Sequence, residues 1–98
     1  MSKYRIIMIS NEHCIHCQNA LRVIKLFVEK NSRNLEYTVI DAVTYRQNNQ
    51  FGKFDEFPVF IFVGRTGNFR KFDFINNEKT ERTYDKLKSV VSEMSRLH

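Results

Sequence analysis

The sequence has little of the residues that shape loops and cross-links: no tryptophan, one proline, three glycines and two cysteines in 98 residues. Two cysteines cannot build a disulfide framework, which uses several widely spaced pairs. No apolar run approaches the roughly 18–20 residues that cross a bilayer, so we expect no membrane partner. Repeats, linkers and low-complexity tracts are also absent, and we therefore expect a single domain over residues 1–98.

The charged residues are mixed along the chain. Sixteen Lys and Arg against eleven Asp and Glu give a net charge of +5, but no block of like charge occurs. Scattered charge is typical of an ordinary solvated surface, so we do not expect nucleic acid as a partner.

The first residues lack the long apolar stretch and small-residue cleavage site of a secretory signal. We therefore expect the protein in the cytoplasm or an equivalent reducing space. Few Gly and Pro beside many Asn, Phe and Ile hint at a biased genome such as that of a virus, and the location would then be the host cytoplasm.

Hydrophobic periodicity predicts an α/β fold. Residues 4–10 are apolar on both faces, as in a central strand, and the apolar spacing over about 14–30 is helical. A strand over 35–41 completes a parallel crossover. Residues 42–56 have weak periodicity and predict a short helix or loop.

The second half predicts a strand at 58–63, a turn, and an alternating outer strand at 69–75. A final helix is expected to begin with Thr83 as its N-cap. The order is strand, helix, strand, short helix, strand, strand, helix. We expect the two long helices to cover the two faces of the sheet.

The chemistry of the chain centres on Cys14-Ile15-His16-Cys17, which lies between the first strand and the first helix. Unpaired amides at a helix start stabilise a thiolate, so we expect Cys14 to have a pKa below that of an ordinary thiol. Cys17 follows one turn later on the same face. The arrangement predicts a nucleophile and a resolving cysteine that form a redox-active disulfide.

Two histidines accompany the pair. His16 lies between the cysteines and His13 precedes Cys14, and each can stabilise the thiolate by a hydrogen bond or a positive charge. The alternative for both is an exposed polar side chain in a turn. We include His16 with Cys14 and Cys17 as a catalytic residue.

The same cysteines also fit a second function, because half of a zinc or iron–sulfur site looks identical. No second cysteine pair is present, and the only other histidine is His98. Dithiol chemistry without a cofactor is the favoured hypothesis, and a metal or iron–sulfur binding module is the alternative.

With these elements in place, the chain resembles the thioredoxin superfamily. The segment "IIMISNEHCIHC" and the proline-led "EFPVFIFVG" carry the resemblance, and the start is glutaredoxin-like because one strand precedes the motif. "GNFRKFDFINNEKTERTYDKL" looks like the last hairpin and helix of disulfide-isomerase domains. The resemblance implies a thioredoxin-like fold with a four-stranded mixed sheet flanked by two or three helices.

The resemblance also implies roles for residues outside the motif. Pro58 matches the family's cis-proline, and Phe57 before it would offer backbone groups to a bound peptide. His13 stands where a tryptophan flanks the motif in relatives, so we add it to the substrate-binding residues. The implied partners are protein disulfides and dithiols, with a thioredoxin reductase or glutathione as the electron donor.

Three departures from the family pattern concern glutathione and proton transfer. Asn11 stands where glutaredoxins have a lysine, and Glu56-Phe57 replaces Thr-Val, which puts glutathione use in doubt. Met8 replaces the buried acid of thioredoxins.

Overall fold

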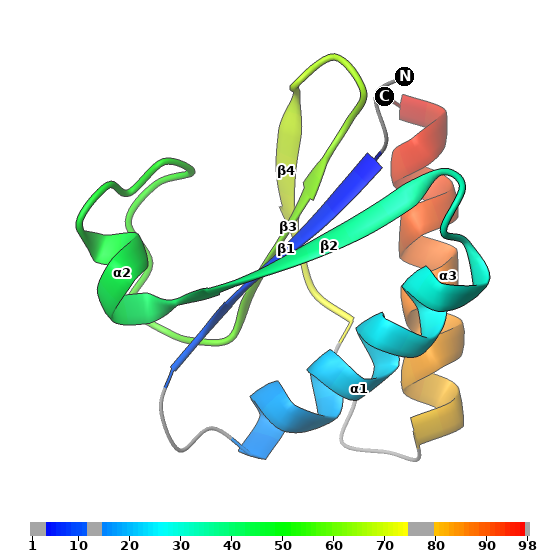
Figure 1. The fold of residues 1–98 in the computed structure, drawn as a ribbon, viewed down its shortest axis with the longest axis horizontal. Coiled ribbons are helices and arrows are strands. Elements are labelled where there is room, and N and C mark those ends of the chain that lie inside the picture. Colours follow the sequence, from blue (N-terminus) through cyan, green and yellow to red (C-terminus); the bar gives the residue numbers. More distant parts are fainter. Residues whose placement is uncertain (1–3, 12–14, 75–79, 98) are drawn as a thin grey trace.

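The computed structural model describes residues 4–11, 15–74 and 80–97, without the side chains of Ile15, His16, Thr80, Glu81 and Leu97. The elements follow in the order β1 (Tyr4–Ser10), α1 (Ile15–Lys30), β2 (Leu35–Asp41), α2 (Ala42–Arg46), β3 (Val59–Val63), β4 (Phe69–Phe72) and α3 (Thr80–Leu97) (Figure 1). The predicted α/β class and element order are confirmed.

The four strands form one mixed sheet in the order β2-β1-β3-β4. β1 pairs with β2 in parallel and with β3 in antiparallel, and β4 closes the sheet as an antiparallel edge. The two most apolar strands, β1 and β3, therefore occupy the centre, as their apolar composition predicts. No helix in the described part of the chain is long and apolar enough to cross a membrane.

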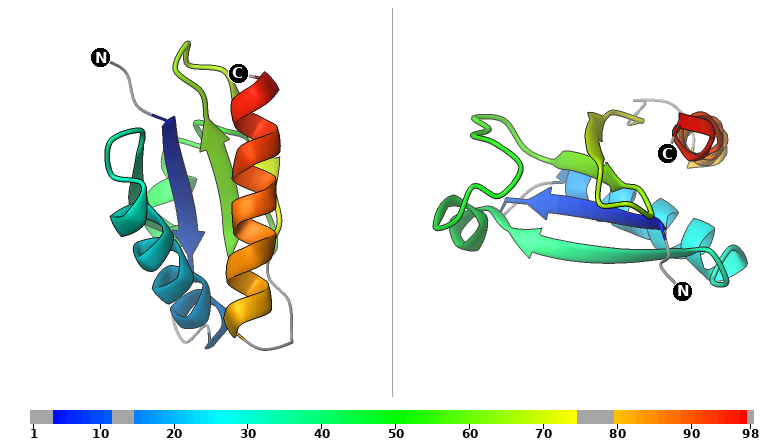
Figure 2. Two further views of the ribbon diagram at one scale, coloured as in Figure 1. Left: turned by 90° about the vertical axis from the view of Figure 1, so that its right-hand side faces the viewer. Right: turned by 90° about the horizontal axis from the view of Figure 1, so that it is seen from above.

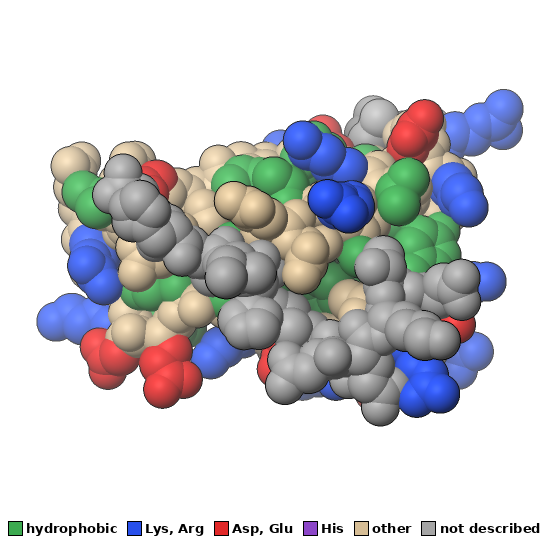
Figure 3. Space-filling view, turned by 90° about the horizontal axis from the view of Figure 1, so that it is seen from below, with side chains coloured by type: hydrophobic (Ala, Val, Ile, Leu, Met, Phe, Trp, Pro, Cys, Tyr) green, Lys and Arg blue, Asp and Glu red, His purple; other side chains and the backbone are tan. Residues whose placement is uncertain are grey.

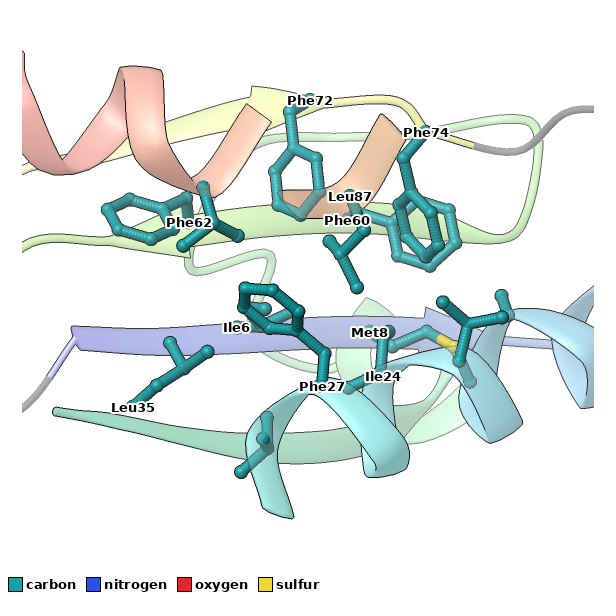
Figure 4. Close-up of a cluster of buried hydrophobic side chains, with 14 of the residues drawn as sticks. Ile6, Met8, Ile24, Phe27, Leu35, Phe60, Phe62, Phe72, Phe74 and Leu87 are labelled. Atoms are coloured by element: carbon teal, nitrogen blue, oxygen red, sulfur yellow. The ribbon is translucent and has the colours of Figure 1, made fainter. Parts of the chain in front are cut away.

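The expectation that the two long helices cover opposite faces is wrong. α1 and α3 lie side by side on the same face, where they bury Ile6, Met8 and Phe60 of the central strands (Figures 2 and 4). The opposite face is covered by α2 and the loop after it, which pack on Ile7 and Ile61 among other residues. The segment 42–56, which has the weakest periodicity, thus covers the face for which the sequence predicts a long helix.

The last helix also begins earlier than predicted. α3 starts at Thr80, so Thr83 is not its cap but lies inside the helix, where it is buried. Successive buried residues of α3 lie about one turn apart and form one stripe, made of Thr83, Leu87, Val91 and Met94. The strand predicted over 69–75 ends at Phe72.

Local side-chain and backbone chemistry explains the end of α1, the start of α2 and the β3–β4 turn. Helix α1 ends where the Asn31 side-chain amide donates a hydrogen bond to the Phe27 carbonyl at 2.8 Å. Asp41 caps α2 by accepting a hydrogen bond from the Val43 amide at 3.1 Å. The β3–β4 turn places Gly67 at φ 91°, a backbone conformation that favours glycine.

Candidate active site

The Cys-x-x-Cys motif lies where the central strand β1 passes into α1. β1 ends at Ser10 and α1 begins at Ile15, so His16 and Cys17 belong to the first turn of the helix. Cys14 and His13 lie outside the described residues, as does the side chain of His16. The predictions made for these three side chains stay predictions.

Of the two cysteines, the structure describes Cys17, and this residue is only 5% exposed. It belongs to the hydrophobic cluster between α1, α3 and the sheet, together with Met8 and Ala20. Met8, at the position of the family's buried acid, is 2% exposed. Among the described residues no carboxylate is buried, so no acid near Cys17 is available inside the core to move a proton.

The strand register brings the single proline to the same end of the sheet. Ile9 of β1 lies opposite Val59 of β3, and Pro58 is the residue before that pair. The Phe57–Pro58 peptide bond is cis, and both residues are partly buried. Ser10 at the end of β1 and Pro58 therefore lie at the same end of the central strands, although 48 positions separate them in the sequence (58 − 10).

Arg46 lies beside Phe57 at this end of the sheet, and the sequence alone did not identify it as a neighbour of the site. Its guanidinium lies 5.3 Å from the centre of the Phe57 ring, within range of a cation–π contact. Arg46 ends α2, and eleven positions of weakly periodic chain separate the two residues. No local pattern could have indicated this contact.

Figure 3 shows this end of the molecule as a surface. Hydrophobic side chains lie exposed among lysine, arginine and acidic side chains.

The described part of the structure adds no ligands to those that the metal hypothesis already names. Across residues 4–11, 15–74 and 80–97, no three His, Cys, Asp or Glu side chains come together as a metal site. Cys14 and His13 are not among these residues, so a site that uses them stays untested.

Comparison with solved structures identifies the fold. The germline-specific thioredoxin Deadhead of Drosophila melanogaster superposes with a TM-score of 0.67 at 17% identity, over 94% of this chain and 81% of that one. MTB DsbF, in mixed oxidised and reduced forms, gives a TM-score of 0.57 at 9% identity, over 92% and 82%. The first two thioredoxin domains of Saccharomyces cerevisiae Eps1p give 0.57 at 15% identity, over 94% of this chain and 34% of that one.

No protein-family model matches the sequence, and neither does any curated protein. At these identities the structural similarities show the fold alone. The chain has a thioredoxin-like fold, as the resemblance of its motifs implies.

Proposed function

We propose that this thioredoxin-fold protein is a thiol–disulfide oxidoreductase in which Cys14 and Cys17 alternate between dithiol and disulfide. The observation that carries the proposal is the placement of Cys17. It lies buried in the first turn of the helix that follows the central strand, at the same end of the central strands as Phe57 and Pro58.

The proposed reaction has two exchange steps. The Cys14 thiolate attacks one sulfur of a protein disulfide, and the other sulfur leaves as a thiolate that takes up a proton. Cys17 then loses its proton and attacks the Cys14 sulfur, which forms the Cys14–Cys17 disulfide and releases the second client thiolate. The client gains two electrons, and the protein loses two.

The burial of Cys17 gives the two cysteines different tasks. A client disulfide cannot approach the sulfur of Cys17, a residue that is 5% exposed, without displacing the core around it. Cys14 therefore makes the first attack, and Cys17 acts only on a disulfide already attached to Cys14. Phe57 and Pro58, with His13, are proposed to receive the client backbone.

The reduced protein is regenerated by a donor of electrons, for which we propose a thioredoxin reductase or glutathione. Asn11 stands where glutaredoxins have a lysine, and this difference favours the reductase. Asn11 is exposed and uncharged, so it cannot supply the positive charge that attracts the glutathione carboxylates.

The test is insulin reduction with single-cysteine variants. Cys14→Ser is expected to abolish turnover, and Cys17→Ser is expected to accumulate mixed disulfides with clients. The double variant Cys14→Ser/Cys17→Ser is the background that should trap nothing. Equal residual activity in the two single variants would refute the assignment of the nucleophile.

A metal assay separates the alternative function. Protein purified under reducing conditions should contain no stoichiometric zinc or iron if the pair is a redox dithiol. One metal ion per chain, lost in either cysteine variant, would instead support the metal-binding function.

A further inference from the structure

The end of the molecule opposite the motif contains a hollow of about 460 Å³. Its lining residues come from the start of β1, the end of α1, the β3–β4 turn and the last turns of α3. Figure 1 shows the start of β1, the β3–β4 turn and the end of α3 at the same end of the molecule. Its volume falls within the roughly 300–1,000 Å³ range of small-molecule sites.

Three positive side chains line this hollow. They are Arg65 of the β3–β4 turn and Lys88 and Arg96 of α3, and none of the described lining residues is acidic. Among the described residues, no carboxylate lies within ion-pair distance of any of the three. Asp85 and Glu93 line the adjoining depression on α3, which Lys88 and Arg96 line as well.

The helix ends reduce this positive charge but do not cancel it. Helices α1 and α3 both direct their C-termini toward the hollow, and each C-terminus carries about half a negative charge. The three cations still outweigh these two partial charges within the hollow. A phosphomonoester, which carries between about −1.5 and −2 charges at neutral pH, is an anion that such a lining attracts.

The remaining lining mixes polar and apolar side chains. Asn31, Asn34, Ser92 and Ser95 supply amides and hydroxyls, and Phe27, Leu35 and Val91 supply apolar surface. The Tyr4 ring is already in contact with Arg65, at 4.7 Å, and with Phe62, at 5.3 Å between centroids. The body of a ligand therefore meets hydroxyl and amide partners as well as apolar contacts.

We propose that this hollow binds a small polyhydroxylated phosphomonoester, with the phosphate held by Arg65, Lys88 and Arg96. An inorganic phosphate ion fills only a small part of the volume, so the hydroxyl-bearing part of the ligand would occupy the rest of the hollow, beside Asn34, Ser92 and Ser95. The site is independent of the thiol chemistry because it lies at the other end of the sheet from Cys17.

Glucose 6-phosphate is the probe, with glucose and inorganic phosphate as references. NMR titration of untagged, nitrogen-15-labelled protein is expected to show saturable shifts of the Asn34, Ser92 and Ser95 amides. Glucose should cause none, and inorganic phosphate should bind at least about tenfold more weakly. The untagged chain is used because β1 starts and α3 ends beside the hollow.

The matched variants are Lys88→Gln/Arg96→Gln and the control Lys86→Gln/Arg82→Gln on the same helix. The first pair should raise the Kd for glucose 6-phosphate about tenfold or more, whereas the control should change it less than about twofold. Cys14→Ser/Cys17→Ser should bind normally, which keeps this test separate from that of the proposed function.

Three results would overturn the proposal. They are the absence of saturable binding up to 10 mM probe, equal weakening by the two double variants, and equal affinity for glucose or inorganic phosphate. A fourth result would also overturn it, namely that a single-stranded oligonucleotide binds through Lys88 and Arg96 whereas glucose 6-phosphate does not bind. That result would assign the surface to a nucleic-acid backbone.

Discussion

The Tyr45 hydroxyl donates a hydrogen bond to the Gly52 carbonyl at 2.6 Å. The same oxygen accepts a hydrogen bond from the Phe51 amide at 2.8 Å, and the Tyr45 ring stacks on Phe54 with centroids 5.8 Å apart. Tyr45 is 4% exposed and belongs to the cluster that covers the second face of the sheet. One side chain of α2 therefore holds the loop that leads to Phe57.

Removing this hydroxyl should loosen the loop. Tyr45→Phe leaves the Phe51 amide and the Gly52 carbonyl without their partner, so we expect the free energy of unfolding to fall by about 1–2 kcal/mol. Urea denaturation measures this loss, and hydrogen exchange should be faster at the Phe51 amide. Tyr37→Phe is the control, because the Tyr37 hydroxyl has no hydrogen bond within the described residues. Equal stability of the two variants would contradict the role of Tyr45.

The second prediction concerns the shared face under α1 and α3. Leu87 of α3 is fully buried, whereas Leu26 of α1 is 43% exposed. We expect Leu87→Ala to lower the free energy of unfolding by about 2–4 kcal/mol, because it leaves a cavity in the core. Leu26→Ala removes the same atoms near solvent and should cost less than about 1 kcal/mol. Similar losses in urea denaturation would show that α3 does not pack as described.

The third prediction tests the burial of Cys17. In a Cys14→Ser background, iodoacetamide should modify Cys17 at least about tenfold more slowly in the folded protein than in urea, because opening of the core must precede the reaction. The control is Cys14→Ser/Cys17→Ser/Gln18→Cys, which moves the thiol one position along the helix to an exposed site. Equal rates for these two folded variants, followed by mass spectrometry, would rule out a buried resolving thiol.

The central strands of the sheet could be predicted because a strand that is buried on both faces is apolar at nearly every position. Residues 4–10 match β1 to the residue, and the apolar run after Pro58 matches β3. The helix stripe of α1 was equally visible. A stripe shows which side of a helix is buried, but it does not show which face of the sheet the helix covers, so the placement of α1 and α3 could not be predicted.

Thr83 illustrates a second limit. Threonine is common at helix starts, and it is also small enough to lie in a core. Thr80, one turn earlier, has the same capping preference, and only the position of Thr83 in line with Leu87 and Val91 distinguishes the two. The contact between Arg46 and Phe57 could not be predicted either, because it depends on the path of a loop without periodicity.

The last prediction concerns the potential of the Cys14–Cys17 couple. His16 lies in the first turn of α1, where its charge or hydrogen bonding would stabilise the reduced form and raise the potential. We expect a value of about −150 to −230 mV, a range that includes the potentials of protein disulfide isomerase and of glutaredoxins. His16→Pro should make the couple more reducing, toward about −270 mV as in thioredoxin, and the first helical turn tolerates proline.

Equilibration with glutathione buffers of known ratio, followed by alkylation of the remaining thiols, measures both values. His16→Gln separates the loss of the imidazole from the gain of the proline ring, and it should shift the potential in the same direction. Lys25→Gln, an exposed change of charge further along α1, should leave it unaltered. If both His16 variants kept the original potential, the thiolate would owe its stability to the helix start alone, because no stabilising charge would have been lost with the imidazole.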